Sequence, residues 1–167
     1  GTVTGVQTCA LPILPNGIDL SLWKPTPSFK LPGNGKYKIV YIGRFTTMKS
    51  VLELVNSDIP KEIDLIIIGD QKGGDVPTLT GLDQILNEKE NIYYIGPKYD
   101  QDKVNSLFSA DAVIIPSKHE PFGIVGLEAL ASKSIVLSSR VDGLGDYLDD
   151  SNSLYCGYTS EEISKSF

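Results

Sequence analysis

Cysteine, histidine and long apolar runs are scarce in this sequence, and each shortage excludes a class of protein. The 167 residues contain two cysteines, Cys9 and Cys156, and a single histidine, His119. Two distant cysteines and one histidine form neither a disulfide framework nor a Cys/His zinc site, so a reducing cytoplasm is expected. No apolar run approaches the roughly 20 residues that a helix needs to span a bilayer. We therefore expect no metal site, no disulfide and no membrane-spanning helix.

Positive charge is also in deficit. The chain has 15 Lys and Arg against 21 Asp and Glu, which gives a net charge of −6. A nucleic-acid partner usually needs a basic face, so this balance argues against one. An anionic small ligand stays compatible with it, because a few local cations are enough to bind phosphate. The length and a hydrophobic content of 41% suit one soluble domain with a sizeable core.

The first 36 residues differ from the rest of the chain. Residues 1–13 read as the in-frame translation of a common short-read sequencing adapter, so we expect a non-native leader there; a disordered leader is the alternative. Residues 14–36 contain the turn-forming sequence Asn16-Gly17-Ile18-Asp19 and three later prolines, which predicts a hinge or linker segment. Residues 37–167 are the predicted folded domain. The sequence stops soon after a helix begins at Ser160, so we expect this domain to be truncated at its C-terminus.

Strands and helices alternate through the predicted domain. Short apolar, β-branched runs predict strands, and apolar residues at helical spacing predict helices. The expected strands are 38–42, 63–68, 92–95, 112–115, 135–138 and 153–156, and the expected helices are 48–56, 79–88, 101–109, 123–131, 144–148 and one from 160 onward. This alternation, with strands apolar along their whole length, indicates a parallel sheet covered by helices on both faces. The predicted fold class is therefore Rossmann-like α/β.

Candidate ligand-binding residues follow the predicted strands. In open parallel sheets, ligands bind beyond the carboxyl ends of the strands. The residues at these ends are Gly43 with Arg44, Gly69 with Asp70, Gly96 with Pro97, and Glu120. Arg44 and Lys49 place two cations after the first strand, where they could clamp a phosphate; two solvated surface cations are the simpler interpretation. Asp70 could contact a base or a ribose, or only shape its turn.

Residues 116–129 are the most informative part of the sequence. A helix is expected to begin near Gly123, with Glu120 just before it and Glu128 in its second turn. A helix N-terminus offers unpaired N–H groups and a positive dipole, which suit a diphosphate. A carboxylate on each side fits a ligand with hydroxyl groups on both sides of its phosphates, as in a nucleotide-sugar. Surface carboxylates that the helix dipole favours are the alternative.

Four further residues are assigned structural roles. His119 is interpreted as structural or exposed rather than as a catalytic base, and Lys118 as a solvated loop residue. Trp23 and Phe29 lie in the linker segment, where packing against the domain is a simpler role than stacking on a ligand.

Taken together, these residues resemble the C-terminal, nucleotide-sugar-binding domain of GT-B retaining glycosyltransferases, and within that group family 4. The resemblance covers residues 14 to about 167. Four motifs carry it: Asn16-Gly17-Ile18-Asp19; Gly43-Arg44 with Lys49; residues 65–70, which end in Gly69-Asp70; and Pro116-Ser117 with Glu120-Pro121-Phe122-Gly123 and Glu128-Ala129. The last motif has the spacing Glu-x7-Glu. Residues 37–167 are accordingly expected to be the C-terminal half of a two-domain GT-B fold.

The resemblance implies a role for each matching residue. Arg44 and Lys49 would hold the donor diphosphate, Glu120 would contact hydroxyls of the transferred hexose, and Glu128 would bind the ribose. The loop residues that would lie against sugar and phosphates, or line the base pocket, are Gly43, Asp70, Pro97, Phe122, Gly123, Ile124 and Val125. The expected donor is a UDP- or GDP-sugar, with no metal and no cofactor, because the two cations replace a metal. Glu120, Arg44 and Lys49 are the residues expected to be catalytic.

The sequence departs from the family pattern at three places, and it covers only part of the enzyme. Ser50 stands where a glycine is usual, and residues 131–135 and 142–146 differ in two loops. An N-terminal acceptor domain is expected to be missing, so the chain alone should be inactive, and contact with the inner membrane surface would come only through that domain. Two alternatives stay open: a GT-B nucleotide-sugar 2-epimerase, and a nucleotide-binding or scaffold module that has lost activity.

Overall fold

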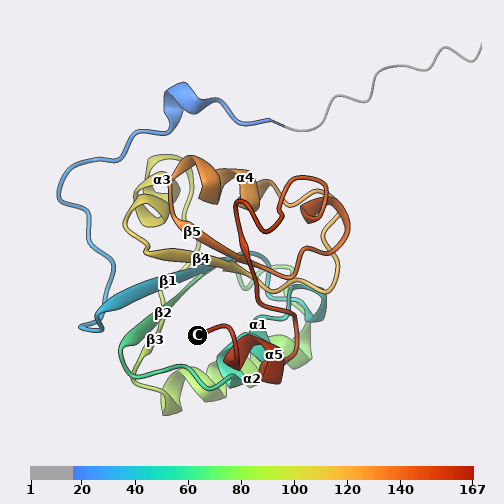
Figure 1. The fold of residues 1–167 in the computed structure, drawn as a ribbon. Coiled ribbons are helices and arrows are strands. Elements are labelled where there is room, and N and C mark those ends of the chain that lie inside the picture. The colour runs from blue at the N-terminus through green and yellow to red at the C-terminus, as the bar shows by residue number, and fades with distance from the viewer. Residues whose placement is uncertain (1–16) are drawn as a thin grey trace, which may run out of the picture.

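The alternating strands and helices form three layers, with one sheet between two groups of helices (Figure 1). The computed structural model describes residues 17–167. The strands are β1 Tyr37–Ile42, β2 Ile63–Ile68, β3 Ile92–Tyr94, β4 Ala112–Ile115, β5 Ile135–Ser138 and β6 Leu154–Tyr155. The helices are α1 Val51–Asn56, α2 Val76–Glu88, α3 Asp100–Phe108, α4 Ile124–Ala131 and α5 Ser160–Ser164, with 3-10 turns η1 Leu20–Leu22, η2 Thr47–Lys49 and η3 Asp142–Leu144. Helices α3 and α4 cover one face of the sheet, and α1, α2 and α5 cover the other.

All six strands run parallel, in the order β3-β2-β1-β4-β5-β6. The chain therefore builds outward from β1 through β2 and β3, and then returns to add β4 on the other side of β1. The helices change face at that return. The order in which strands are added to the sheet reverses between β1 and β4. Open α/β sheets bind ligands at such a reversal point. The predicted Rossmann-like parallel sheet is confirmed.

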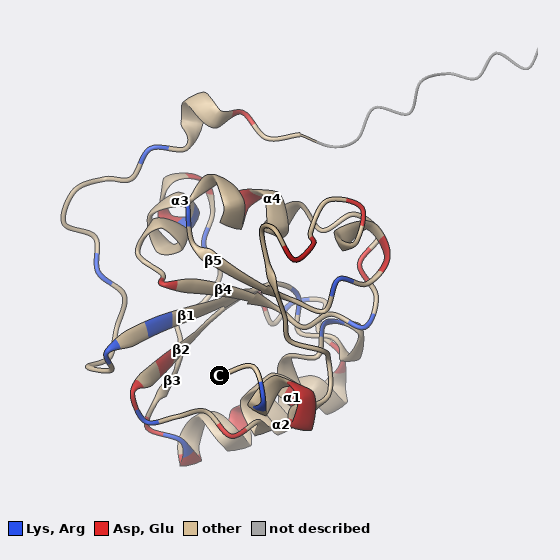
Figure 2. Ribbon diagram, viewed as in Figure 1, with Lys and Arg blue, Asp and Glu red and all other residues tan. Residues whose placement is uncertain are grey.

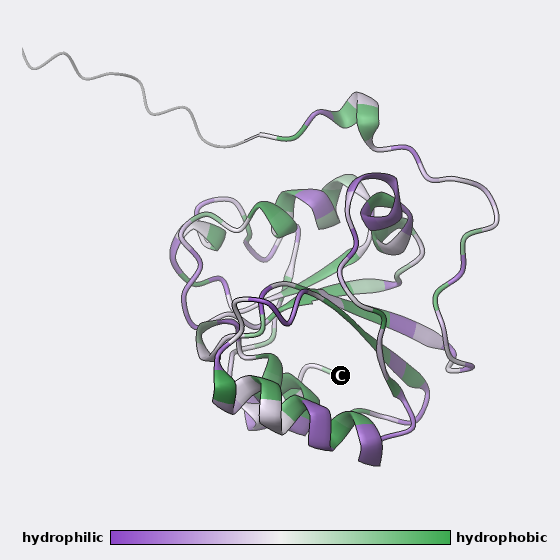
Figure 3. Cartoon of the chain, turned by 180° about the vertical axis from the view of Figure 1, so that it is seen from behind, coloured by the Kyte–Doolittle hydropathy of each residue, from purple (hydrophilic) through white to green (hydrophobic). Residues whose placement is uncertain are grey.

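Successive side chains of β1 point to opposite faces of the sheet, and both faces are covered. Ile39 and Tyr41 belong to the cluster under α1, α2 and α5, whereas Val40 packs in the cluster under α3 and α4. Every residue of β2 is buried, and all of them are apolar except Asp64, which pairs with Lys38 of β1. Seen from behind, the strands are mostly green with hydrophobic residues, whereas the helices and loops carry both green and purple (Figure 3). Burial of each such Ile, Leu or Val contributes about 1.5–3 kcal/mol.

Three of the predicted helices differ clearly from the observed elements. Helix α1 begins at Val51 rather than at Met48, because Met48 lies in η2. Helix α2 begins three residues early, since the Asp75 side chain accepts a hydrogen bond from Thr78 N–H at 3.0 Å and caps the helix. The predicted helix 144–148 is instead the single turn η3. Helix α5 begins at Ser160, as predicted, and Thr159 caps it through a capping box with Glu162.

The predicted linker packs along the domain. Thr26 N–H donates to Asn105 Oδ1 at 2.7 Å, and Gln101 Nε2 donates to the Lys24 carbonyl at 2.8 Å, so this segment is fastened to α3. Trp23 and Phe29 are partly buried against the cluster under α3 and α4, which confirms their predicted packing. The predicted leader at residues 1–13 lies outside the described residues.

Helix length bears on membrane insertion. The longest described helix, α2, has 13 residues. None of the helices in residues 17–167 has the length and apolar character of a membrane-spanning segment.

Ser50, one of the three departures from the family pattern, lowers the stability of the folded domain. It is fully buried with φ 51°, in the left-handed region, and its hydroxyl has no hydrogen-bond partner among the described residues. A non-glycine residue there costs roughly 1–2 kcal/mol, and an unsatisfied buried hydroxyl costs about 1–3 kcal/mol. Replacement by glycine removes both, while the greater freedom of unfolded glycine offsets about 0.5–1 kcal/mol. We expect Ser50→Gly to raise the free energy of unfolding by about 1 kcal/mol in urea denaturation.

Ser57 supplies a matched control for that prediction. It is also buried, but its φ of −69° is ordinary and its hydroxyl donates to the Leu54 carbonyl at 2.6 Å. Ser57→Gly should therefore lower the free energy of unfolding. If both glycine variants shift stability in the same direction, strain at Ser50 is not the cause.

Candidate functional site

A cleft of about 220 Å³ lies between the carboxyl ends of β1 and β4, the two strands at which the strand order reverses. The residues that line it are Tyr41, Ile42, Gly43, Arg44, Lys49, Ile114, Ile115, Ser117, Glu120, Gly123, Ile124 and Val125. Seven of them were predicted from the sequence as donor-binding residues: Gly43, Arg44, Lys49, Glu120, Gly123, Ile124 and Val125. The structure thus brings together residues that lie up to 82 positions apart in the chain, from Gly43 to Val125.

The N-terminus of α4 forms one wall of the cleft. Gly123 precedes the helix with φ 80°, and no side chain caps the helix start. The first N–H groups of the helix, including those of Ile124 and Val125, therefore have no partner within the helix. They lie at the positive end of the helix dipole, which favours an anion. A Cβ at Gly123 would lie 2.3 Å from a methyl carbon of Leu144, so only glycine fits this approach. An anion is the ligand that such a wall suits.

Two cations stand opposite this helix start. Lys49 is the last residue of η2, and its Nζ pairs with Glu120 and also donates to the His119 carbonyl at 3.2 Å. Its side chain is only 12% exposed, so solvent screens it little. Arg44 is exposed and forms no ion pair with any residue of the described range. Basic and acidic segments gather in the loops at this end of the sheet, at the right of the view (Figure 2).

Glu120 is held by a loop that comes later in the chain. Its N–H donates to Asp142 Oδ2 at 2.9 Å, and its carbonyl accepts from Gly143 N–H at 3.2 Å. Tyr147 donates its hydroxyl to the Gly123 carbonyl, which fixes the other end of the same turn. The loops meet so closely that a Cβ at Gly143 would lie 2.3 Å from a backbone oxygen of Pro121. Residues 142–147 therefore shape the cleft, although they were predicted only as a departure from a family pattern.

Two tyrosines near Glu120 keep their protons. Tyr41 lies at the floor of the cleft and donates its hydroxyl to the Arg44 carbonyl at 2.9 Å. Burial, and after it the Glu120 charge, raises the pKa of Tyr41 well above its usual range. The same two causes raise the pKa of Tyr147 to about 12. Both side chains are hydrogen-bond donors at neutral pH rather than bases.

Glu128 lies in a different pocket from Glu120. It is 5% exposed, and one carboxylate oxygen lies 2.5 Å from Lys103 Nζ. The two side chains line a neighbouring pocket of about 470 Å³ together with residues of α3 and of the entering segment: Ile18, Asp19, Leu22, Trp23, Asp100, Gln101 and Val104. The two glutamates that the sequence placed on either side of one helix start thus face two adjacent pockets.

Three predicted donor-binding residues line neither pocket. Asp70 accepts a hydrogen bond from Lys72 N–H at 2.9 Å and so shapes its own turn, and Pro97 is exposed after β3. Phe122 stacks obliquely on Tyr147, with ring centroids 5.5 Å apart. That the loop at Pro97 lines a base-binding pocket stays a prediction.

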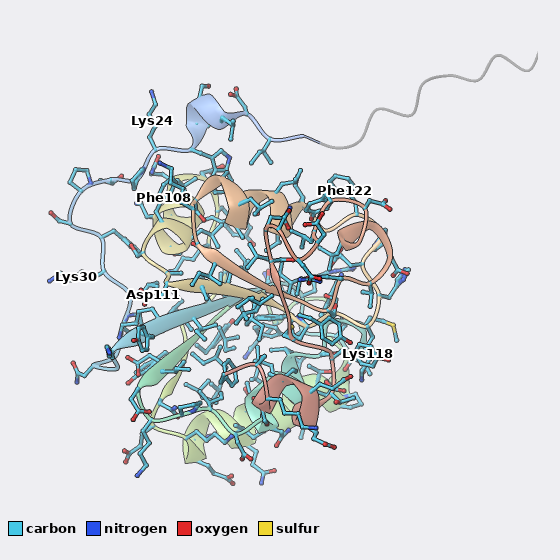
Figure 4. All side chains as sticks on the ribbon, viewed as in Figure 1. Lys24, Lys30, Phe108, Asp111, Lys118 and Phe122 are labelled. Carbon is cyan, nitrogen blue, oxygen red and sulfur yellow. The ribbon has the colours of Figure 1, made fainter. Side chains whose placement is uncertain are left out.

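Lys118 and Phe122, both labelled in Figure 4, mark the two ends of a loop, and each of these side chains contacts another segment. The prediction that Lys118 is a solvated loop residue is wrong, because its ammonium pairs with Glu53 of α1 and its side chain is 29% exposed. His119 is exposed, as predicted, and its Nδ1 lies 2.6 Å from Asp142 Oδ2. Residues 17–167 contain no cluster of His, Cys, Asp and Glu that could hold a metal ion.

The parallel sheet, its strand order and the cleft at the reversal point define a Rossmann-like ligand-binding domain. Residues 25–166 match the family model described as glycosyl transferases group 1. The chain belongs to that family, and its fold is that of the C-terminal domain of GT-B glycosyltransferases. The resemblance found in the sequence is confirmed.

Three known proteins illustrate the match. The alpha-maltose-1-phosphate synthase of Mycolicibacterium smegmatis is 25% identical over 152 residues, which are 83% of this chain and 39% of that protein. The structure of Anabaena HepE in complex with UDP-glucose has a TM-score of 0.75 at 19% identity, over 90% of this chain and 44% of HepE. The C-terminal domain of LpcC from Francisella tularensis has a TM-score of 0.68 at 23% identity, over 89% and 85% of the two chains. The chain spans about two fifths of the length of the first curated relatives it matches.

Proposed function

We propose that this chain is the donor-binding domain of a glycosyltransferase that takes a hexose from a nucleoside-diphosphate sugar with retention of anomeric configuration. The observation that carries the proposal is the cleft where the strand order reverses, with an uncapped helix N-terminus on one wall and two cations on the other. A diphosphate matches that arrangement in charge, because backbone N–H groups and Lys or Arg side chains are the usual ligands of phosphate oxygens. HepE, which shares the fold, is described in complex with UDP-glucose.

Each part of the cleft has a defined task in this proposal. Lys49, Arg44 and the α4 N-terminus neutralise the negative charge that develops on the diphosphate as it leaves the sugar. Glu120 hydrogen-bonds hydroxyls of the sugar, and the paired Glu128 receives the ribose in the adjacent pocket. The cations do the work that a metal ion would otherwise do, so no metal and no cofactor is required.

The complete reaction also needs a site for the acceptor. The residues that line the cleft are assigned to the donor in this proposal, so the acceptor must be bound by other residues. An N-terminal domain would supply those residues, so we propose that this chain binds donor but does not transfer sugar alone.

Calorimetric titration tests the proposal directly. The 167-residue chain is titrated with UDP, UDP-glucose, GDP and GDP-mannose at up to millimolar concentration, with adenosine as a control that lacks phosphate. We expect saturable binding of one nucleotide pair, weakened by added salt because charge carries much of the affinity. The absence of binding by all four nucleotides would refute the donor-domain proposal.

A further inference from the structure

Asp142 is the residue through which the β5–β6 loop holds Glu120. Its Oδ2 accepts the Glu120 N–H at 2.9 Å and lies 2.6 Å from His119 Nδ1. The hydrogen bond from Glu120, followed by smaller contributions that include His119, keeps the pKa of the Asp142 carboxyl below its usual range. The acceptor is therefore a carboxylate at neutral pH, and bonds to an ionised acceptor are shorter and stronger than neutral ones.

The backbone of Asp142 is strained, and glycine would relieve the strain. Its φ is 47°, in the left-handed region that favours glycine. The described partners of its side chain are Glu120 N–H and His119. Strained non-glycine residues persist where the surrounding structure uses them. The carboxylate of Asp142 is thus directed at the loop that carries Glu120, although Asp142 does not itself line the cleft.

We propose that Asp142 is a positioning residue for the transferred sugar: by holding the Glu120 main chain, it fixes the direction in which the Glu120 carboxylate faces the cleft. This inference rests on the proposed function. Lys49 and the α4 N-terminus, which would contact the diphosphate, belong to other segments and form no hydrogen bond with Asp142. The role is therefore selective, because it concerns recognition of the sugar and not of the nucleoside diphosphate.

The test compares the affinity of a nucleoside diphosphate with that of its sugar conjugate. Calorimetry on the 167-residue chain gives both dissociation constants for wild type, Asp142→Gly, Asp142→Asn and Asp146→Asn. Asp146 is an exposed carboxylate of the same loop that forms no side-chain hydrogen bond within the described range, so it controls for charge. We expect Asp142→Gly to reduce the preference for the sugar conjugate about three- to tenfold, the range of one hydrogen bond, with a smaller change in UDP or GDP affinity. Asp142→Asn keeps an acceptor and should retain most of the preference.

A second measurement does not depend on any ligand. Hydrogen exchange of the Glu120 amide, followed by NMR, should be faster in Asp142→Gly than in wild type, and close to wild type in Asp142→Asn and Asp146→Asn. The glycine variant removes the left-handed strain, so its melting temperature should not fall, which separates lost positioning from lost folding.

The outcomes are distinct. Unchanged Glu120 exchange in Asp142→Gly overturns the inference whether or not any nucleotide binds. An equal loss of affinity for the diphosphate and its sugar conjugate also overturns it, because it shows a general effect on the cleft. Failure of the wild-type chain to bind any nucleotide refutes the proposed function instead, while the exchange experiment still decides whether Asp142 holds Glu120.

Discussion

Lys49→Met is expected to weaken binding of a nucleoside diphosphate by about 10- to 100-fold. A hydrogen bond to a charged group contributes about 1.5–3 kcal/mol, and about 1.4 kcal/mol corresponds to a factor of ten in affinity. Lys49 is mostly buried, so solvent does not replace its charge, and methionine preserves only the apolar stem. The change also leaves Glu120 without its ion-pair partner, and an unpaired carboxylate in the cleft repels phosphate. Both effects act in the same direction, and isothermal titration with UDP or GDP measures their sum.

Lys118 provides the matched control for this experiment. It lies at the same end of the sheet and is also paired with a glutamate, Glu53, but its side chain is more exposed, at 29% against 12%, and it does not line the cleft. Lys118→Met should leave nucleotide affinity within about twofold, since it removes the same charge outside the cleft. Equal losses in the two variants would mean that net charge, rather than contact with the phosphates, determines binding. Wild-type affinity in Lys49→Met would exclude Lys49 from the diphosphate site.

The second large effect concerns stability rather than binding. Lys103→Met is expected to lower the free energy of unfolding by about 3 kcal/mol, because it leaves the Glu128 carboxylate buried without its counter-charge. Glu128 is 5% exposed and its oxygen lies 2.5 Å from Lys103 Nζ, so water cannot solvate the remaining charge fully. Urea denaturation of the 167-residue chain, followed by circular dichroism, measures the change.

A double variant separates the ion pair from simple loss of packing. In Lys103→Met/Glu128→Gln the buried charge is gone as well, so much of the stability should return, with a coupling of about 1–3 kcal/mol between the two changes. Glu128→Gln alone isolates the effect of removing the carboxylate. Additive losses would show that the two side chains do not stabilise each other in solution. Under the proposal that Glu128 receives the ribose, Glu128→Gln should also bind nucleotide more weakly.

The fold was predictable from local patterns, because each buried strand is a short apolar run and each run ends in a turn. Strand β2 is the clearest example, because five of its six buried residues are Ile or Leu and only Asp64 is charged. Helix ends were less predictable. The start of α2 was missed although Asp75 stands in the sequence as a good cap, since the preceding Gly73-Gly74 favoured a longer loop. The left-handed Ser50, which delays the start of α1, has no sequence signal at all beyond the missing glycine.

The candidate site was predictable in its position but not in its supports. The topology of a parallel sheet places Arg44 and Glu120 at one edge, so strand ends alone locate the cleft. The contacts of Asp142 and Tyr147 with the Glu120 turn join segments more than 20 residues apart. Such contacts depend on how β5 and the loop after it pack against the Glu120 turn, which local sequence patterns do not predict. The separation of Glu120 and Glu128 into adjacent pockets could likewise not be predicted, because a spacing of eight residues does not determine which way each side chain points.

Under the proposed function, the ion pair between Lys49 and Glu120 would make nucleotide binding an exchange of anions. A diphosphate that reaches Lys49 competes with a carboxylate already attached to the protein, so the measured affinity is the difference between two electrostatic attractions. The displaced carboxylate is then free to accept hydrogen bonds from sugar hydroxyls. A free diphosphate would leave that carboxylate without such partners, whereas a sugar conjugate provides them within the same molecule. The pair would therefore act as an internal competitor that disfavours the spent nucleotide relative to the loaded donor.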